Sequence, residues 1–128
     1  MTLCGPEIFG ADPVNVKWNV VRGDTSTIKV EFYENDEVTF YNTEGWEYVA
    51  SVYSSREEVI DELTVVAGEG YAEIIASPDV TKNWGAGYSV GSVGELLFDL
   101  QVTFDGTVWT PVIGTVNILG DVTYGGTL

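Results

Sequence analysis

The strongest constraint on the fold is an alternation of apolar and polar side chains with a period of two. In the segment 14–21 every second residue from Val14 is apolar, and asparagine or lysine occupies most of the alternate positions. Successive side chains of a β-strand point to opposite faces of the sheet, so this segment predicts a strand with one buried face. Trp18 lies on the apolar face and is predicted to anchor the core.

Similar short runs recur along the chain, and Gly, Asp and Asn separate them. This pattern is typical of a β-sandwich or barrel, and it predicts about seven or eight strands. Trp46 falls on the apolar face of one run and is predicted as a second core anchor. Beyond the first strand, the predicted strands cover residues 27–33, 38–41, 46–53, 60–66, 71–76, 95–104 and 108–119.

The sequence between the first two strands predicts a turn and a hairpin. In Arg22-Gly23-Asp24-Thr25, Gly23 can adopt a positive φ and the Asp24 carboxylate can accept hydrogen bonds from nearby backbone amides. Arg22 can pair with one of the many acidic residues. We therefore expect strands 14–21 and 27–33 to form an antiparallel hairpin.

Two further hairpins and one helical turn are expected. Gly68-Glu69-Gly70 and Asp105-Gly106-Thr107 each separate two apolar runs, which is a strong signal for a tight turn between strands. Residues 77–84 are the one place where a helical turn is expected, because Ser77 can cap a helix and Pro78 suits its first position.

The size of the chain fits a single domain with two short extensions. With 128 residues, of which 45% are hydrophobic and 12% aromatic, the chain is large enough to form one hydrophobic core but not two. We expect a β-sandwich domain over residues 14–123, an extended arm over 1–13 and a short tail over 124–128. The arm is broken by Gly and Pro yet contains Ile8 and Phe9, so it is predicted to dock on a partner through these two side chains.

The charge balance restricts the partners. The chain has 20 acidic and 5 basic residues, a formal net charge of -15, and no basic residue after Lys82. Phosphate groups would be repelled, so nucleic acid is not expected as a partner, and a basic or apolar protein surface is. The sequence contains no run of about 18 apolar residues and no signal-peptide pattern, so no membrane association is expected.

The residue types argue against catalysis and against a bound cofactor. Histidine is absent and Cys4 is the one cysteine, which removes the usual general base, the commonest metal ligand and any disulfide. Paired carboxylates would be the remaining enzymatic route. Residues 34–37, with the sequence Glu-Asn-Asp-Glu, could hold calcium or could form a solvated turn, and their spacing matches no defined calcium loop.

A carbohydrate-binding module is a further alternative. Trp84 and Trp109 lie near predicted loops or strand ends, where exposed indole rings could stack on sugars. This alternative predicts that at least one of the two rings is exposed to solvent.

The order of several short motifs resembles a group of bacteriophage and prophage structural domains. The motifs are the Arg-Gly-Asp-Thr turn after the first strand, Thr81-x-x-Trp84, Phe98-Asp99-Leu100-Gln101, and Thr110 to Gly114 followed by Gly120-Asp121-Val122-Thr123. The chain is similar to the amino-terminal, immunoglobulin-like domain of phage upper baseplate proteins. It departs from that pattern where Leu96 or Leu97 replaces a Tyr before Phe98-Asp99, and in its arm.

This resemblance implies an all-β, immunoglobulin-like antiparallel sandwich with one short helical turn. It also implies a non-enzymatic virion structural protein of the tail or baseplate, assembled in the host cytoplasm, which binds other virion proteins in symmetric multiple copies. A capsid decoration protein with the same fold is the alternative. The shared residues would then be structural turn motifs: Arg22, Gly23, Asp24, Asp99, Gly114 and Asp121. The aspartates would lie at turns and strand ends, where a carboxylate can accept hydrogen bonds from backbone amides.

Overall fold

The computed structural model describes residues 2–4, 12–34, 36, 38–55, 58–84 and 93–119. In these residues the chain forms strands and one short helix. The elements are β1 (Thr2–Cys4), β2 (Val14–Val21), β3 (Ser26–Tyr33), β4 (Glu47–Ser55), β5 (Glu58–Gly68), β6 (Tyr71–Ala76), α1 (Pro78–Thr81), β7 (Val93–Phe104) and β8 (Thr107–Leu119).

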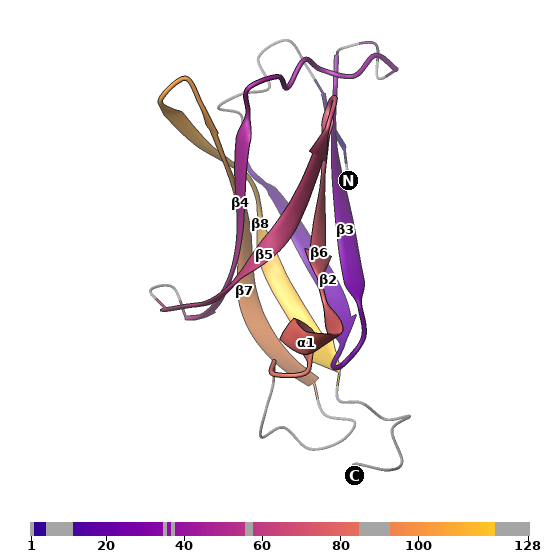
Figure 1. Cartoon of the computed structure of the whole chain (residues 1–128), viewed down its shortest axis with the longest axis vertical. Helices are drawn as coiled ribbons and strands as arrows, with labels where there is room; N and C mark the ends of the chain where they lie inside the picture. Colours follow the sequence, from indigo (N-terminus) through magenta and orange to yellow (C-terminus); the bar gives the residue numbers. More distant parts are fainter. Residues whose placement is uncertain are drawn as a thin grey trace.

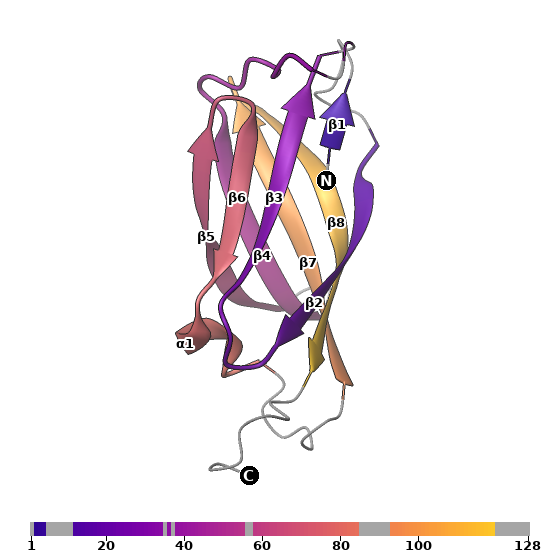
Figure 2. The same ribbon diagram turned by 90° about the vertical axis from the view of Figure 1, so that its right-hand side faces the viewer.

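The strands form two packed layers (Figures 1 and 2). One layer has the order β1-β3-β6-β5 and the other has the order β4-β7-β8-β2. Strand β5 joins them, because its first half pairs with β4, as in Leu63 opposite Ala50, and its second half pairs with β6, as in Thr64 opposite Ile75. The order β3-β6-β5 facing β4-β7-β8 is that of an immunoglobulin-like sandwich.

The predicted hairpin between β2 and β3 is wrong. Strand β2 runs parallel to β8, with Trp18 opposite Val116, whereas β3 is antiparallel to β6 in the other layer. The alternating pattern shows which face of a strand is buried, but it does not identify the neighbouring strand. The turn at residues 22–25 therefore crosses between the layers.

The sandwich is consequently mixed rather than purely antiparallel. The β2–β8 ladder is parallel, and so is the short ladder between β1 and β3, while the remaining ladders described are antiparallel. Among the expected strands, 38–41 contributes only an isolated bridge between Phe40 and Tyr33.

The other two predicted hairpins are confirmed. Gly68 pairs with Tyr71 across Glu69-Gly70, and Phe104 pairs with Thr107 across Asp105-Gly106. Asp105 and Gly106 have φ values of 50° and 79°, and positive φ at both central residues is typical of the type I′ turns that match strand twist. The predicted helical turn is α1, with Pro78 at its start. Ser77 occupies the N-cap position, but its side chain makes no capping hydrogen bond, so that part of the prediction is wrong.

The core lies between the two layers; of the predicted anchors, Trp18 belongs to it and Trp46 packs against it. Trp18 is 5% exposed and packs edge-on against Phe98, with ring centroids 5.4 Å apart. Trp46 is partly buried and its ring lies 5.1 Å from Phe32 and 6.1 Å from Trp109. Such edge-to-face pairs add to the hydrophobic stabilisation that burial supplies.

The amino-terminal segment is more regular than expected. Residues 2–4 form strand β1, whose backbone pairs with residues 31–33 of β3. Part of the predicted arm is thus attached to its own domain. The edge of β3 that faces away from β6 offers backbone groups with which it can pair. Within the described residues, no helix is long and apolar enough to cross a membrane.

Candidate functional site

The outward face of β2, β8, β7 and β4 carries two adjacent rows of side chains that cross all four strands. The strand registers place Asn15, Ile113, Asp99 and Ser51 in one row. They place Lys17, Thr115, Leu97 and Tyr53 in the next row. Side chains two residues apart on a strand share a face, so the rows form one continuous surface.

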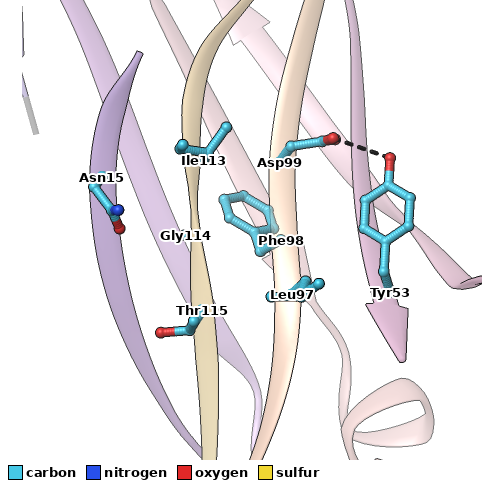
Figure 3. A pocket seen from close by; sticks show the side chains of 8 residues that line it. All are labelled: Asn15, Tyr53, Leu97, Phe98, Asp99, Ile113, Gly114 and Thr115. Atoms are coloured by element: carbon cyan, nitrogen blue, oxygen red, sulfur yellow. Dashed lines mark hydrogen bonds between the residues drawn. The ribbon is translucent and has the colours of Figure 1, made fainter. Parts of the chain in front are cut away.

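This surface is hollowed where the rows meet (Figure 3). The hollow has a volume of about 490 Å³. It is lined by Asn15, Tyr53, Leu97, Phe98, Asp99, Ile113, Gly114 and Thr115. Ile113 remains 38% exposed, which leaves apolar surface beside a charged group.

Asp99 is the acidic group of the hollow, and it lies within β7 rather than at a turn or strand end. Its predicted role of accepting hydrogen bonds from backbone amides is therefore wrong, because an outward side chain in mid-strand faces away from the ladder. The carboxylate instead accepts a hydrogen bond of 3.0 Å from the Tyr53 hydroxyl. This bond runs diagonally between the two rows, from β4 to β7 (Figure 3).

Burial and the Tyr53 contact have opposite effects on the pKa of Asp99. Partial burial raises the pKa of the Asp99 carboxyl above its usual value, and the hydrogen bond from Tyr53 opposes that rise. The pKa of Tyr53 is also raised, first by burial and then by the neighbouring carboxylate. Within the described residues, the Asp99 carboxylate has no cationic partner.

Gly114 is also part of a strand and not of a turn. It lies in the middle of β8, opposite Val16 of β2. A Cβ atom at this position would lie 1.9 Å from the Val16 carbonyl oxygen, closer than real atoms approach. Glycine is therefore required by the close approach of the β2 backbone, and the predicted turn role is corrected.

The Arg22–Asp24 turn is held by a residue far away in the sequence. The Thr81 hydroxyl of α1 accepts a 3.1 Å hydrogen bond from the Gly23 amide and donates a 2.7 Å bond to the Asp24 carbonyl oxygen. Gly23 has a φ of 93°, as the turn requires. Asp24 contributes through its backbone carbonyl, and its side chain is exposed.

The same region contains Arg22, whose amide donates to the Leu119 carbonyl oxygen at the end of β8. The turn is thereby connected to α1 on one side and to the last strand on the other. Two motifs of the resemblance, the Arg-Gly-Asp-Thr turn and Thr81-x-x-Trp84, form one hydrogen-bonded unit.

Both tryptophans proposed as sugar platforms are buried. Trp84 is 1% exposed and its indole N–H donates a 2.7 Å hydrogen bond to Asp61 of β5. Trp109 is 6% exposed and packs against Trp46 and Phe32. Neither ring presents a face to solvent, so the carbohydrate alternative loses the residues on which it depended.

In the acidic turn after β3, the central carboxylate is hydrogen-bonded within the turn itself. Asp36 accepts hydrogen bonds from the amides of Val38 and Thr39 and from the Thr39 hydroxyl. These bonds lower the pKa of Asp36, chiefly through Thr39. In the part of the chain that the structure describes, no group of three His, Cys, Asp or Glu residues could hold a metal ion.

The predicted partner-binding residues Ile8 and Phe9, and the predicted turn residue Asp121, lie outside the described residues. The structure instead identifies a different set of candidate residues, on the outward face of β2, β8, β7 and β4. Alternation alone would place Tyr53 on the other face of β4 from Val52, facing outward. Only the strand register shows that Tyr53 reaches Asp99.

No known protein family matches this chain, and no curated protein does. Among solved structures, it is similar to the N-terminal domain of phage TP901-1 ORF48, with 18% identity, 94% of either chain covered and a TM-score of 0.43. It is also similar to a titin I27 domain mutant, with 10% identity, a TM-score of 0.42, and 88% of this chain and 89% of that chain covered.

Proposed function

We propose that this chain is a non-enzymatic virion structural protein of a bacteriophage, an assembly or adaptor domain of the tail or baseplate that binds neighbouring virion subunits. The observation that carries the proposal is the hollow on the outward face of β2, β8, β7 and β4. A sheet face that combines exposed apolar side chains with one half-buried carboxylate suits a protein interface.

The sequence resemblance supplies the virion context. Its motifs occur in order along the domain, and two of them meet in the contact between Thr81 and the turn of Gly23 and Asp24. This contact supports treating those two motifs as markers of the fold.

The chemistry of the described side chains supports a binding role over catalysis. Burial and the Tyr53 hydrogen bond are the causes of the altered Asp99 pKa, and no second carboxylate contributes to it. An acid–base pair of the glycosidase type needs two carboxyl groups that face each other across a substrate. Asp99 faces a tyrosine instead.

The test is to locate the chain on the particle. A tagged chain is produced during infection by the phage that encodes it, the particles are purified, and the tag is labelled for electron microscopy. We expect label at the tail or baseplate. Label on the capsid would establish the alternative, a decoration protein. Particles without label, from cells in which the tagged chain is produced and folded, would overturn the proposal.

A further inference from the structure

We infer that the hollow on the outward sheet face receives a basic side chain, flanked by apolar ones, from a different protein of the particle. The inference rests on the proposed function and names the chemistry of the partner. It combines the position of Asp99 in the hollow, the apolar side chains beside it and the charge of the whole chain.

Asp99 has capacity for a further partner. A carboxylate offers about four acceptor positions, and the described contacts of Asp99 use one, for the Tyr53 hydroxyl. The Tyr53 bond holds the carboxylate in place between β4 and β7 (Figure 3). A fixed carboxylate suits a guanidinium or ammonium group, because less conformational entropy is lost on binding.

The surroundings of Asp99 suit the stem of a long basic side chain. Ile113 is directly opposite Asp99 in the ladder, and Leu97 is two residues away on the same face of β7. Lysine and arginine bury their methylene groups on apolar surface while the charged end finds its partner. A hollow with a carboxylate at one side and aliphatic walls matches that two-part side chain.

The charge of the chain argues for a different protein rather than a second copy. Each copy has a formal net charge of -15, so two copies meeting through this face would repel each other. Lys17 is on the same face, in the same row as Thr115, but it makes no ion pair with Asp99. A basic partner would relieve the excess negative charge that a second copy would increase.

The first experiment measures binding of a defined probe to the full chain. Acetyl-Leu-Arg-Leu-amide is titrated into the isotopically labelled chain and the backbone amide shifts are followed by NMR. A peptide with citrulline in place of arginine has nearly the same shape without the charge. We expect shifts centred on Leu97, Asp99 and Thr115, and binding of the arginine peptide at least about tenfold tighter than that of the citrulline peptide.

Matched variants identify the group responsible. Asp99→Asn removes the charge in the hollow and keeps an oxygen that can accept the Tyr53 hydrogen bond. Glu95→Gln removes one charge from an exposed position on the same strand, outside the hollow. We expect Asp99→Asn to abolish the difference between the two peptides and Glu95→Gln to retain it. An unchanged amide spectrum away from β4 and β7 would show that both variants are folded.

Three results would overturn the inference. Equal binding of the citrulline peptide would make the hollow an apolar contact. Equal effects of Asp99→Asn and Glu95→Gln would show that the preference for the arginine peptide comes from the overall charge of the chain. Concentration-dependent self-association that maps to Ile113 and Leu97 would identify a second copy as the occupant.

The particle assay separates this inference from the proposed function. If the unaltered chain is absent from particles, the proposed function fails, whereas the peptide titration still tests the hollow. If the unaltered chain and Glu95→Gln are incorporated, we expect Asp99→Asn to be reduced several-fold. Incorporation of Asp99→Asn at the unaltered level would refute the basic partner and leave the proposed function in place.

Discussion

At the scale of single residues, Asp99 and Gly114 owe their roles to neighbours on other strands. Gly114 lies where the β2 backbone approaches β8, so a missing side chain is what this position needs. Asp99 faces outward between Ile113 on β8 and Ser51 on β4, and its hydrogen bond goes to Tyr53. Both residues are therefore sensitive to the packing of strands that are distant in sequence.

Replacing Gly114 with alanine is expected to lower the free energy of unfolding by about 1–3 kcal/mol, as over-packing commonly does. The new Cβ would meet the Val16 carbonyl oxygen, which is backbone and cannot rotate away. Urea denaturation measures the loss. Thr115→Ala, at the adjacent outward-facing position, is the control and should cost much less; equal losses for the two variants would contradict the steric explanation.

Asp99→Asn is expected to change the pH dependence of stability. Burial raises the pKa of Asp99 in the folded chain, so the protonated form is the one that folding favours. Its favourable contribution is present below the unfolded value of about 3.9 and is lost as the pH rises through the higher folded value. The variant should therefore gain stability over the unaltered chain between about pH 4 and pH 7.

Urea denaturation of both chains at pH 3.5 and pH 7 checks this expectation. The difference between them should be larger at pH 7. A difference that is the same at both values would show that the Asp99 pKa is not raised.

At the scale of elements, α1 secures a crossing between the two layers. The helix is only four residues long, and short helices are not stable alone. It is held because the Thr81 hydroxyl bonds the turn after β2 and the Trp84 indole bonds β5. The segment 77–84 thus connects the turn that follows β2 with β5, the strand that joins both layers.

Thr81→Val is expected to destabilise the fold by about 1–3 kcal/mol, because the Gly23 amide and the Asp24 carbonyl lose their partner. Valine has nearly the same shape as threonine, so packing of the fully buried side chain changes little. Thermal or urea denaturation measures the loss. Amide hydrogen exchange at Gly23 should accelerate in the same variant.

Thr81→Ser is the matched control, since it keeps the hydroxyl and removes only a methyl group. It should retain slow exchange at Gly23. Similar exchange in the valine and serine variants would mean that the hydroxyl does not hold the turn.

At the scale of the whole molecule, the sandwich presents an acidic surface with a defined sheet face, and its amino-terminal segment is attached through β1. Because Thr2–Cys4 pair with β3, deleting the whole arm would remove a strand as well as the residues predicted to dock. Point substitutions test the docking prediction more sharply than a deletion.

The double substitution Ile8→Ala and Phe9→Ala is expected to leave the unfolding transition unchanged and to reduce incorporation into particles strongly. The reason is that the two side chains are predicted to bury apolar surface on a partner, which contributes to association rather than to folding. Quantitative blotting of purified particles measures incorporation. Normal incorporation would refute the docking arm, and a large loss of stability would assign these side chains to the domain itself.

The sequence by itself determined most of the strands and two of the three predicted hairpins. Period-two alternation depends only on local geometry, so β2 and β6 begin and end at the predicted residues. Asp105-Gly106 specifies its own turn through backbone preferences. The buried position of Trp18 follows from the same alternation.

Only the tertiary structure decided which strands distant in sequence are neighbours, and with them the candidate site. Pairing between β2 and β8 joins residues about 100 positions apart, and no local pattern encodes such a register. That pairing explains Gly114 and places Asn15 beside Ile113; the pairing of β4 with β7 brings Tyr53 to Asp99. The physical reason is that the face of a strand is a local property, whereas a hollow across four strands depends on every register between them.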